Sequence, residues 1–207
     1  MLIVDWDIHH GNGTQKAFLA DPSVLYLSVH RYDHGRFFPG TGNPTVVGTG
    51  PGQGYTVNVA WNGGGMGDRE YRAVWRRLLL PVARAFGPEL VLVSAGFDGA
   101  DGDEMGGCRV TPAGFGALTR ALVEGVPSAQ GRVVLALEGG YKLSVLSRCV
   151  EACLEALLGN ESATGGVEEM EEEEEDDDDE GPIAPEAEEA ISRALEIHRA
   201  YWSCLRE

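Results

Sequence analysis

The sequence of 207 residues has few basic side chains, few cysteines and no long apolar segment. Its 16 Lys and Arg stand against 33 Asp and Glu, and a formal net charge of −17 does not fit the basic surface that binds nucleic acid. No apolar run approaches the roughly 20 residues of a membrane-spanning helix. Met1 leads directly into an apolar strand pattern rather than a signal peptide. We therefore expect no direct contact with nucleic acid or membrane.

The negative charge is concentrated in one segment. Every residue from Glu168 to Glu180 except Met170 is acidic, and without these 12 carboxylates 21 acidic residues remain against 16 basic ones. Such a run cannot bury apolar surface, so residues 160–185 are predicted to be an acidic disordered linker. It would join a domain of residues 1–159 to an amphipathic C-terminal helix at 186–207. The apolar face of that helix, which includes His198, is expected to dock on the domain rather than bind a partner.

Cysteine usage indicates a reducing compartment. The four cysteines form no C-x-x-C pair, and two of them lie one helical turn apart in an apolar helix pattern, where buried free thiols are the ordinary expectation. We therefore expect the protein to reside in the nucleus or the cytoplasm. The cysteines are Cys108, Cys149, Cys153 and Cys204.

The hydrophobic pattern predicts an α/β fold with a mostly parallel sheet and helices on both faces. Several apolar runs are continuous rather than alternating, as in strands covered on both sides, and helical stretches lie between some of them. The expected strands are residues 2–4, 24–29, 55–61, 90–94 and 133–137.

Three helices are expected within the domain. The apolar period of residues 68–86 passes Pro81 only with a kink or break. Thr111 and Pro112 have the pattern of an N-cap followed by proline at the first helical position. Residues 144–158 form an amphipathic pattern that stops near Gly159.

The most informative motif follows the first apolar run. In extended backbone, Asp5, Asp7 and His9 project to the same side. Carboxylates and an imidazole at the end of a strand suit a divalent transition metal, with zinc the leading candidate. The glycines that follow allow a sharp turn.

Two further polar clusters follow strands, at Ser94–Asp98 and Leu137–Tyr141. Ligands of open α/β sheets bind beyond the carboxyl ends of the strands, so the clusters are expected to meet the first motif. Asp98 would complete a site of two carboxylates and one imidazole, with positions left for water and substrate. The phenol of Tyr141 could stabilise a developing oxyanion. Taken singly, Asp98 also fits a helix cap, and Tyr141 a half-buried aromatic.

Five segments resemble, in order, the C-terminal portion of the histone deacetylase catalytic domain. They are DWDIHHGNGTQ, SVHRYDHGRFFPGTG, GYTVNVAWN, ELVLVSAGFDGADGDEMGGC and LALEGGY. The class II, zinc-dependent branch is the most similar. The resemblance implies the arginase-deacetylase fold and hydrolysis of N-acetyl-lysine in proteins, and it extends from Leu2 to about Leu158.

The resemblance also implies roles for individual residues. Tyr141 would be the oxyanion-stabilising phenol, and Asp5 and Asn12 would support two catalytic histidines. An apolar residue at the position of Met105 favours acetyl-lysine in protein, since polyamine-specific relatives carry a carboxylate there. The implied ligands are Asp7, His9 and Asp98 for zinc and Asp5, Asp7, His9, Ser28 and Val29 for a structural potassium ion; Phe38, Met105 and Gly140 would line the substrate channel.

The family's domain is longer, and its N-terminal half carries the tandem histidines that act as general base and acid. His9 and His10 are not that pair, because they align with the ligand block. His10, His30 and His34 are expected to be structural or loop residues. On this basis the fold is truncated at the N-terminus, and the chain alone is expected to be weakly active and marginally stable.

Three functions remain open. The first is a deacetylase of histone tails or cytosolic proteins, with corepressor-type protein partners. The second is a non-catalytic zinc-binding pseudo-enzyme that recruits partners. The third is an amidohydrolase for acetylated polyamines. An arginase-like hydrolase is disfavoured, because paired metal ligands are not visible.

Overall fold

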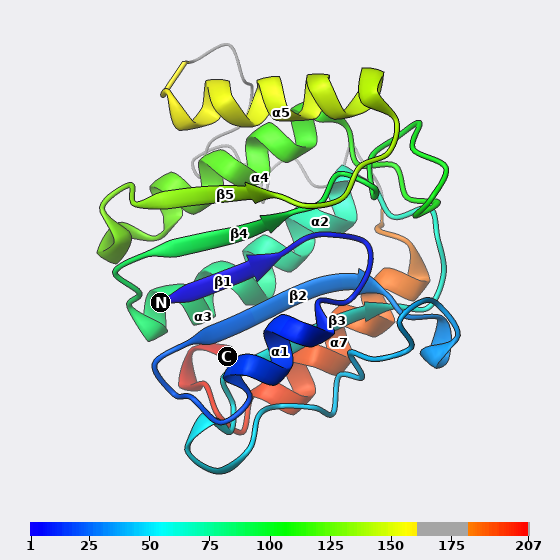
Figure 1. Ribbon diagram of the computed structural model, residues 1–207. Coiled ribbons are helices and arrows are strands. Elements are labelled where there is room, and N and C mark those ends of the chain that lie inside the picture. Colours follow the sequence, from blue (N-terminus) through cyan, green and yellow to red (C-terminus); the bar gives the residue numbers. More distant parts are fainter. Residues whose placement is uncertain (161–181, 207) are drawn as a thin grey trace.

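A computed structural model describes residues 1–160 and 182–206 (Figure 1). Most of the predicted acidic linker, residues 161–181, lies outside the described part. Among the described residues, no helix has the length and apolar character needed to cross a membrane.

Five parallel strands form one sheet in the order β3-β2-β1-β4-β5. All five expected strands are present, with ends that differ from the prediction by at most two residues. Their bounds are β1 Leu2–Asp5, β2 Leu25–Arg31, β3 Thr56–Trp61, β4 Val91–Ala95 and β5 Val133–Leu137.

The strand order reverses at β1. The chain runs outward from β1 through β2 to β3 and then returns to place β4 on the other side of β1, where Asp5 is paired with Ser94. The connections that leave β1 and β4 therefore diverge at their carboxyl ends. This switch point is where open α/β sheets bind ligands.

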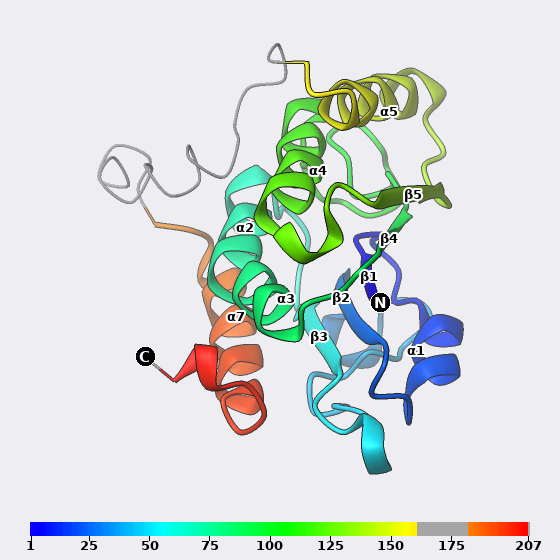
Figure 2. The same ribbon diagram turned by 90° about the vertical axis from the view of Figure 1, so that its left-hand side faces the viewer.

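Helices cover the two faces unequally (Figure 2). α2, α3, α4 and α7 lie on one face over the main apolar core, α5 packs on α4, and α1 lies on the other face. On β5 this second face leaves the apolar side chain of Val134 51% exposed. The bounds are α1 Asn12–Phe18, α2 Asp68–Val74, α3 Leu80–Phe86, α4 Pro112–Gly125, α5 Leu143–Leu157 and α7 Pro185–His198.

Local sequence signals explain two features of these helices. Because Pro81 has no N–H to donate, the hydrogen-bond ladder changes before it, and a π-helical segment at Trp75–Leu79 joins α2 to α3. At α4, the Thr111 hydroxyl accepts a hydrogen bond from the N–H of Gly114 at 2.9 Å, and Pro112 occupies the first turn. The predicted break and the predicted cap are both confirmed.

The C-terminal helix packs against β3. Its apolar face, including Ile191, is buried, and the indole N–H of Trp202 donates to the carbonyl of Gly54 at 3.0 Å. Arg77 holds the exposed side of the helix through two hydrogen bonds to the Glu188 carboxylate, at 2.6 and 2.8 Å. The helix ends at His198, and a single 3-10 turn follows at Ser203–Leu205.

Candidate metal centre

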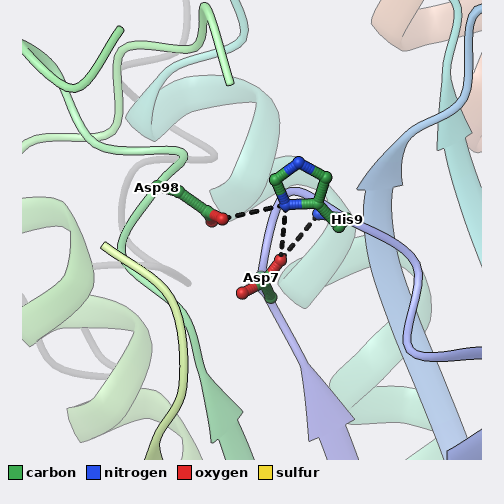
Figure 3. A group of neighbouring side chains, drawn as sticks. All are labelled: Asp7, His9 and Asp98. Carbon is green, nitrogen blue, oxygen red and sulfur yellow. Dashed lines mark hydrogen bonds and ion pairs between the residues drawn. The ribbon is translucent and has the colours of Figure 1, made fainter. Parts of the chain in front are cut away.

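Asp7, His9 and Asp98 converge beyond the carboxyl ends of β1 and β4 (Figure 3). Nδ1 of His9 lies 2.9 Å from Oδ2 of Asp98 and 3.2 Å from Oδ1 of Asp7. One ligand atom from each residue lies within 4.8 Å of the others. Asp98 is fully buried, whereas 23% of the His9 side chain is exposed. The group is therefore closed on one side and open on the other.

Backbone hydrogen bonds fix both carboxylates. The N–H of Ile8 donates to Oδ1 of Asp98 at 3.0 Å, and the N–H of His9 donates to Oδ1 of Asp7 at 2.7 Å. Ile8 is itself buried in the core, which anchors the turn between the two β1 ligands. Oδ2 of Asp98 consequently faces the imidazole. Contacts within the chain thus orient both candidate carboxylate ligands.

Charge on the two carboxylates favours a cation between them. Hydrogen bonds that the protonated His9 ring donates to Asp7 and Asp98 raise its pKa to about 9, against an opposing effect of burial. The proton on His9 thus supplies the positive charge that the two carboxylates favour, which a bound metal ion would supply instead. Two carboxylates and one imidazole with an open side suit zinc in a catalytic arrangement, since zinc accepts oxygen and nitrogen ligands and leaves a position for water.

Glycines allow the surrounding backbone to approach the ligands closely. A Cβ atom on Gly96 would overlap the carboxylate of Asp7, and a Cβ atom on Gly139, two residues after β5, would lie 2.5 Å from the same carboxylate. The two glycine segments are joined by a hydrogen bond of 3.0 Å from the N–H of Phe97 to the carbonyl of Gly139. The sequence pattern did not identify Gly96 as important, because its role depends on Asp7, which lies 89 residues away along the chain.

An aromatic pair flanks His9. The ring of Phe37 stacks on the imidazole with centroids 5.2 Å apart and an interplanar angle of 19°, and Phe38 approaches its edge at 6.1 Å. Phe38 is 76% exposed, whereas Phe37 is partly buried. The guanidinium of Arg31 lies 4.8 Å from the centroid of the Phe37 ring. The sequence analysis identified Phe38 alone as a channel residue, although the adjacent Phe37 could have been recognised from the same Phe-Phe pair.

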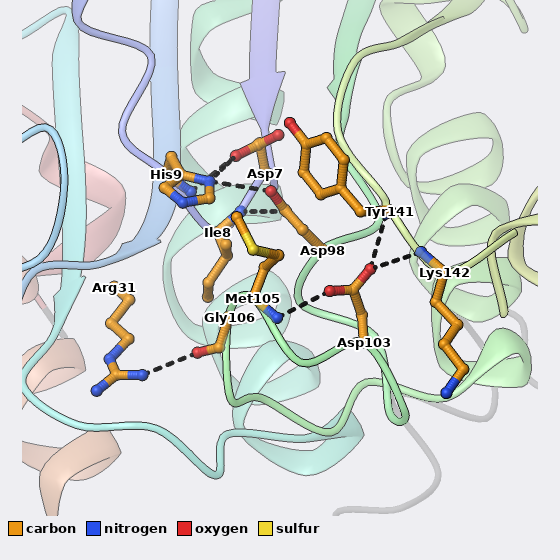
Figure 4. Close-up of polar contacts among 10 residues, drawn as sticks. All are labelled: Asp7, Ile8, His9, Arg31, Asp98, Asp103, Met105, Gly106, Tyr141 and Lys142. Carbon is orange, nitrogen blue, oxygen red and sulfur yellow. Dashed lines mark hydrogen bonds and ion pairs between the residues drawn. The ribbon is translucent and has the colours of Figure 1, made fainter.

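Tyr141 and Met105 lie around the open side of the group (Figure 4). The phenol of Tyr141 points toward Asp7 in this view, and the side chain is 66% exposed. Met105 is 53% exposed. Gly140 has a φ of +114°, a conformation that favours glycine, and a Cβ atom there would lie 3.2 Å from Cβ of Phe97.

Asp5 carries an unpartnered oxygen beneath the ligand group. It is paired in register with Ser28 on β2, and its Oδ2 accepts a hydrogen bond of 2.8 Å from the Tyr26 hydroxyl. Oδ1 is buried without a hydrogen-bond partner, and burial raises the pKa of the carboxyl. An orphaned buried carboxylate oxygen beside a hydroxyl suits a monovalent cation. Asn12, in contrast, is exposed at the start of α1.

His10 and His30 belong to a separate buried network. The ring nitrogens of His10 lie 2.8 Å from the Thr41 hydroxyl and 3.1 Å from Oε1 of Gln15. Those of His30 lie 2.8 Å from Oγ of Ser28 and 3.0 Å from the carbonyl of Gly42. Burial lowers the pKa of both residues, to about 3 for His30. Both imidazoles are therefore neutral structural groups at neutral pH.

The ligand group, its place at the switch point and the family comparison agree. The histone deacetylase domain family matches residues 1–157 of the chain. The chain belongs to this family. Histone deacetylase 9 of Homo sapiens is 57% identical over 166 residues, and histone deacetylase 18 of Arabidopsis thaliana is 51% identical over 170 residues. These stretches cover 78% and 81% of the chain but only 16% and 24% of the two relatives.

Two solved structures of histone deacetylases share the fold over nearly the whole chain. The crystal structure of the HDA15 HD domain aligns with a TM-score of 0.85 at 40% identity, and the histone deacetylase Clr3 with a TM-score of 0.85 at 43% identity. Each alignment covers 99% of this chain, and it covers 52% and 32% of the respective relative. The predicted class II-like relationship and the predicted fold are confirmed. The chain spans about half of a deacetylase domain of known structure.

Proposed function

We propose that Asp7, His9 and Asp98 bind one zinc ion, and that the domain to which these residues belong hydrolyses N-acetyl-lysine in proteins. The observation that carries the proposal is the convergence of three ligand atoms within 4.8 Å at the switch point of a deacetylase-family sheet. The exposed phenol of Tyr141 and the exposed ring of Phe38, which lies at the edge of the His9 imidazole, support the same proposal.

The surrounding residues have distinct proposed tasks. Bound zinc would act as a Lewis acid on the amide carbonyl and lower the pKa of its water. The Tyr141 hydroxyl would donate a hydrogen bond to the carbonyl oxygen as that oxygen becomes negative. Phe38 and Met105, with the backbone of Gly140, would cover the methylene groups of the acyl-lysine side chain, which favours their transfer from water.

The site has no general base among three of the chain's histidines. His10 and His30 are hydrogen-bonded in their own network, and His198 is buried at the end of α7, so none of the three offers a general base. Acid–base catalysis typically contributes 10²–10⁴-fold. We therefore propose slow turnover by these 207 residues alone. Asp5 and Asn12 would support catalytic histidines contributed by the longer domain.

A structural potassium ion is proposed beneath the zinc. It would be held by Asp5, Ser28 and the backbone around Asp7, His9 and Val29. The unpartnered Oδ1 of Asp5 is the observation that supports it. A cation there would compensate the buried charge of Asp5 and stabilise the turn that carries the zinc ligands.

The proposed substrates are acetylated histone tails or acetylated cytosolic proteins, in the nucleus or the cytoplasm. Corepressor-type proteins are the proposed partners. A purely zinc-binding interaction module is one alternative. The hydrogen bonds that engage His10 and His30 favour it, because they leave neither residue as a general base. An acetylpolyamine hydrolase is the other alternative, and the exposed thioether of Met105 speaks against it, because an apolar side chain does not attract a polycation.

The test begins with metal content. The purified chain is expected to bind one zinc ion per molecule, and Asp98→Ala is expected to lose it, whereas Asp101→Ala, which changes an exposed neighbour, is expected to retain it. Equal zinc content in the wild type and Asp98→Ala would reject the site.

Activity is then measured as acetate release from an acetyl-lysine peptide. The chain is assayed alone and as a chimera in which it replaces the matching 52% of the HDA15 HD domain. A zinc-loaded chimera without activity would contradict the deacetylase function and favour the interaction module. In an active chimera, Met105→Glu should shift preference from the peptide toward an acetylated polyamine.

A further inference from the structure

Asp103 is a buried carboxylate that the metal centre does not use. It lies five residues after Asp98, in the loop that carries Met105, and only 6% of it is exposed. Its Oδ1 accepts a hydrogen bond of 2.9 Å from the N–H of Met105. Its Oδ2 accepts hydrogen bonds from the N–H groups of Tyr141 and Lys142, at 2.8 and 3.2 Å (Figure 4).

The backbone that Asp103 holds needs an external restraint. Tyr141 follows Gly139 and Gly140, and glycine gives the chain more conformational freedom than any other residue. The side chain of Tyr141 is 66% exposed, so packing fixes it weakly. Charge-assisted hydrogen bonds to a buried carboxylate are shorter and stronger than neutral ones. Asp103 is thus well suited to fix the backbone of Tyr141, from which the phenol side chain projects.

The electrostatics of α5 favour the same arrangement. This helix begins at Leu143 with Lys142 as its N-cap. The free N–H groups and the positive end of the helix dipole attract a carboxylate. The negative charge of Asp103 therefore lies at the end of α5 where it is stabilised.

A second contact holds the Met105 loop from the opposite side. Nη1 of Arg31 donates to the carbonyl of Gly106 at 3.0 Å, and Nε of Arg31 donates to Asp33 at 2.9 Å. Arg31 also covers the Phe37 ring that stacks on His9. The loop between Asp98 and Gly106 is therefore tied to the aromatic pair by Arg31 and to Tyr141 by Asp103.

We propose that Asp103 is the positioning residue for Tyr141: it fixes the backbone of residues 141–142 against the Met105 loop and so aims the phenol at the metal centre. This inference rests on the proposed function for its catalytic consequence. The physical restraint can be measured without it.

Asp103→Asn is the most direct variant. The shape is retained, but one carboxylate oxygen becomes an NH₂ group that cannot accept a hydrogen bond from the main chain. Glu104→Gln and Asp101→Asn are matched controls, because each neutralises an exposed carboxylate in the same loop. Arg31→Gln releases the Gly106 carbonyl and leaves the Tyr141 N–H bound.

The first readout is amide hydrogen exchange at residues 139–143 in the metal-loaded chain. Asp103→Asn should raise the exchange rate there at least about tenfold, as local opening requires, with zinc content and melting temperature close to wild type. The two controls and Arg31→Gln should leave exchange at residues 141–142 unchanged. Unchanged exchange in Asp103→Asn would overturn the proposal. If Asp103→Asn does not fold, Asp103→Glu, which keeps the charge but moves it, should give the same local increase.

The second readout is a double-mutant cycle in the chimera. A misplaced catalytic group can cost about 10²-fold, so Asp103→Asn should lower kcat by that order with a smaller change in KM. In the Tyr141→Phe background the same substitution should cost nothing further, and an equal loss in both backgrounds would overturn the proposal. If the zinc-loaded chimera releases no acetate at all, the proposed function fails, and the exchange measurement still decides the role of Asp103.

Discussion

Gly139 packs directly against the carboxylate of Asp7. A Cβ atom at residue 139 would lie 2.5 Å from Oδ2 of Asp7 and 2.8 Å from Oδ2 of Asp98. The segment that follows β5 thus lies against the carboxylates of both candidate metal ligands. The same segment leads two residues later to Tyr141, which links the geometry of the phenol to that of the ligands.

Gly139→Ala is therefore expected to impair metal binding. The methyl group would displace one or both carboxylates, and disturbing the support of metal ligands typically costs 10–100-fold in affinity. Zinc titration against a competing chelator measures the change. Gly13→Ala is the control, since a Cβ atom there meets nothing within 4 Å. Equal affinities in the two variants would contradict the inferred contact.

Zinc binding should depend on pH through His9. Its pKa is raised to about 9 by Asp7 and Asp98, and a ligating imidazole must give up its proton. Apparent zinc affinity should rise by up to about tenfold per pH unit below pH 9. Calorimetry in buffers of different ionisation enthalpy should detect a released proton.

The metal-free chain should show the opposite trend in stability. Because the pKa of folded His9 is raised from 6.5 to about 9, its contribution is complete below pH 6.5 and is lost as the pH rises through about 9. Urea unfolding of wild type and His9→Gln across this range tests the sign. A metal-free wild type that gains stability relative to His9→Gln over this range would contradict it.

His198 should make the fold sensitive to acid. The ring is buried with both nitrogens unpartnered, and burial lowers its pKa to about 4. The unfolded state binds a proton near pH 6.5, so this contribution to stability is lost as the pH falls from 6.5 toward 4.

Between pH 7 and pH 5, the free energy of unfolding should fall by about 2 kcal/mol less in His198→Leu than in the wild type. Equilibrium unfolding at the two pH values measures it. His34→Gln, at an exposed position, is the control and should behave as wild type. The pKa values of His10 and His30 are also lowered, so some acid sensitivity should persist in the variant.

Apolar burial rather than the ion pair should hold α7 in place. Ile191 is fully buried, whereas the Glu188 side chain is 48% exposed in its pair with Arg77. Ile191→Ala is expected to cost about 2–5 kcal/mol through lost contacts and a cavity. Glu188→Gln is expected to cost less than about 1 kcal/mol, as exposed ion pairs do. Denaturant unfolding that ranks Glu188→Gln as the more damaging variant would show that charge dominates.

The sequence by itself determined the strands, the helix cap at Thr111, the break at Pro81 and the types of ligand. Each depends on neighbours within a few residues: a continuous apolar run, a missing N–H, or the two-residue spacing of Asp7 and His9. Asp98 was also within reach, because residues that follow parallel strands share one edge of the sheet.

Only the tertiary structure decided which strands adjoin β1, and with that order came the contacts around the ligands. Gly139 against Asp7, Phe37 over His9 and Asp103 under Tyr141 join segments that lie far apart along the chain. No local pattern encodes them, because a glycine, a second phenylalanine or a loop aspartate has the same local preferences whatever it meets. Packing of distant backbone therefore turned a predicted set of ligands into an oriented site.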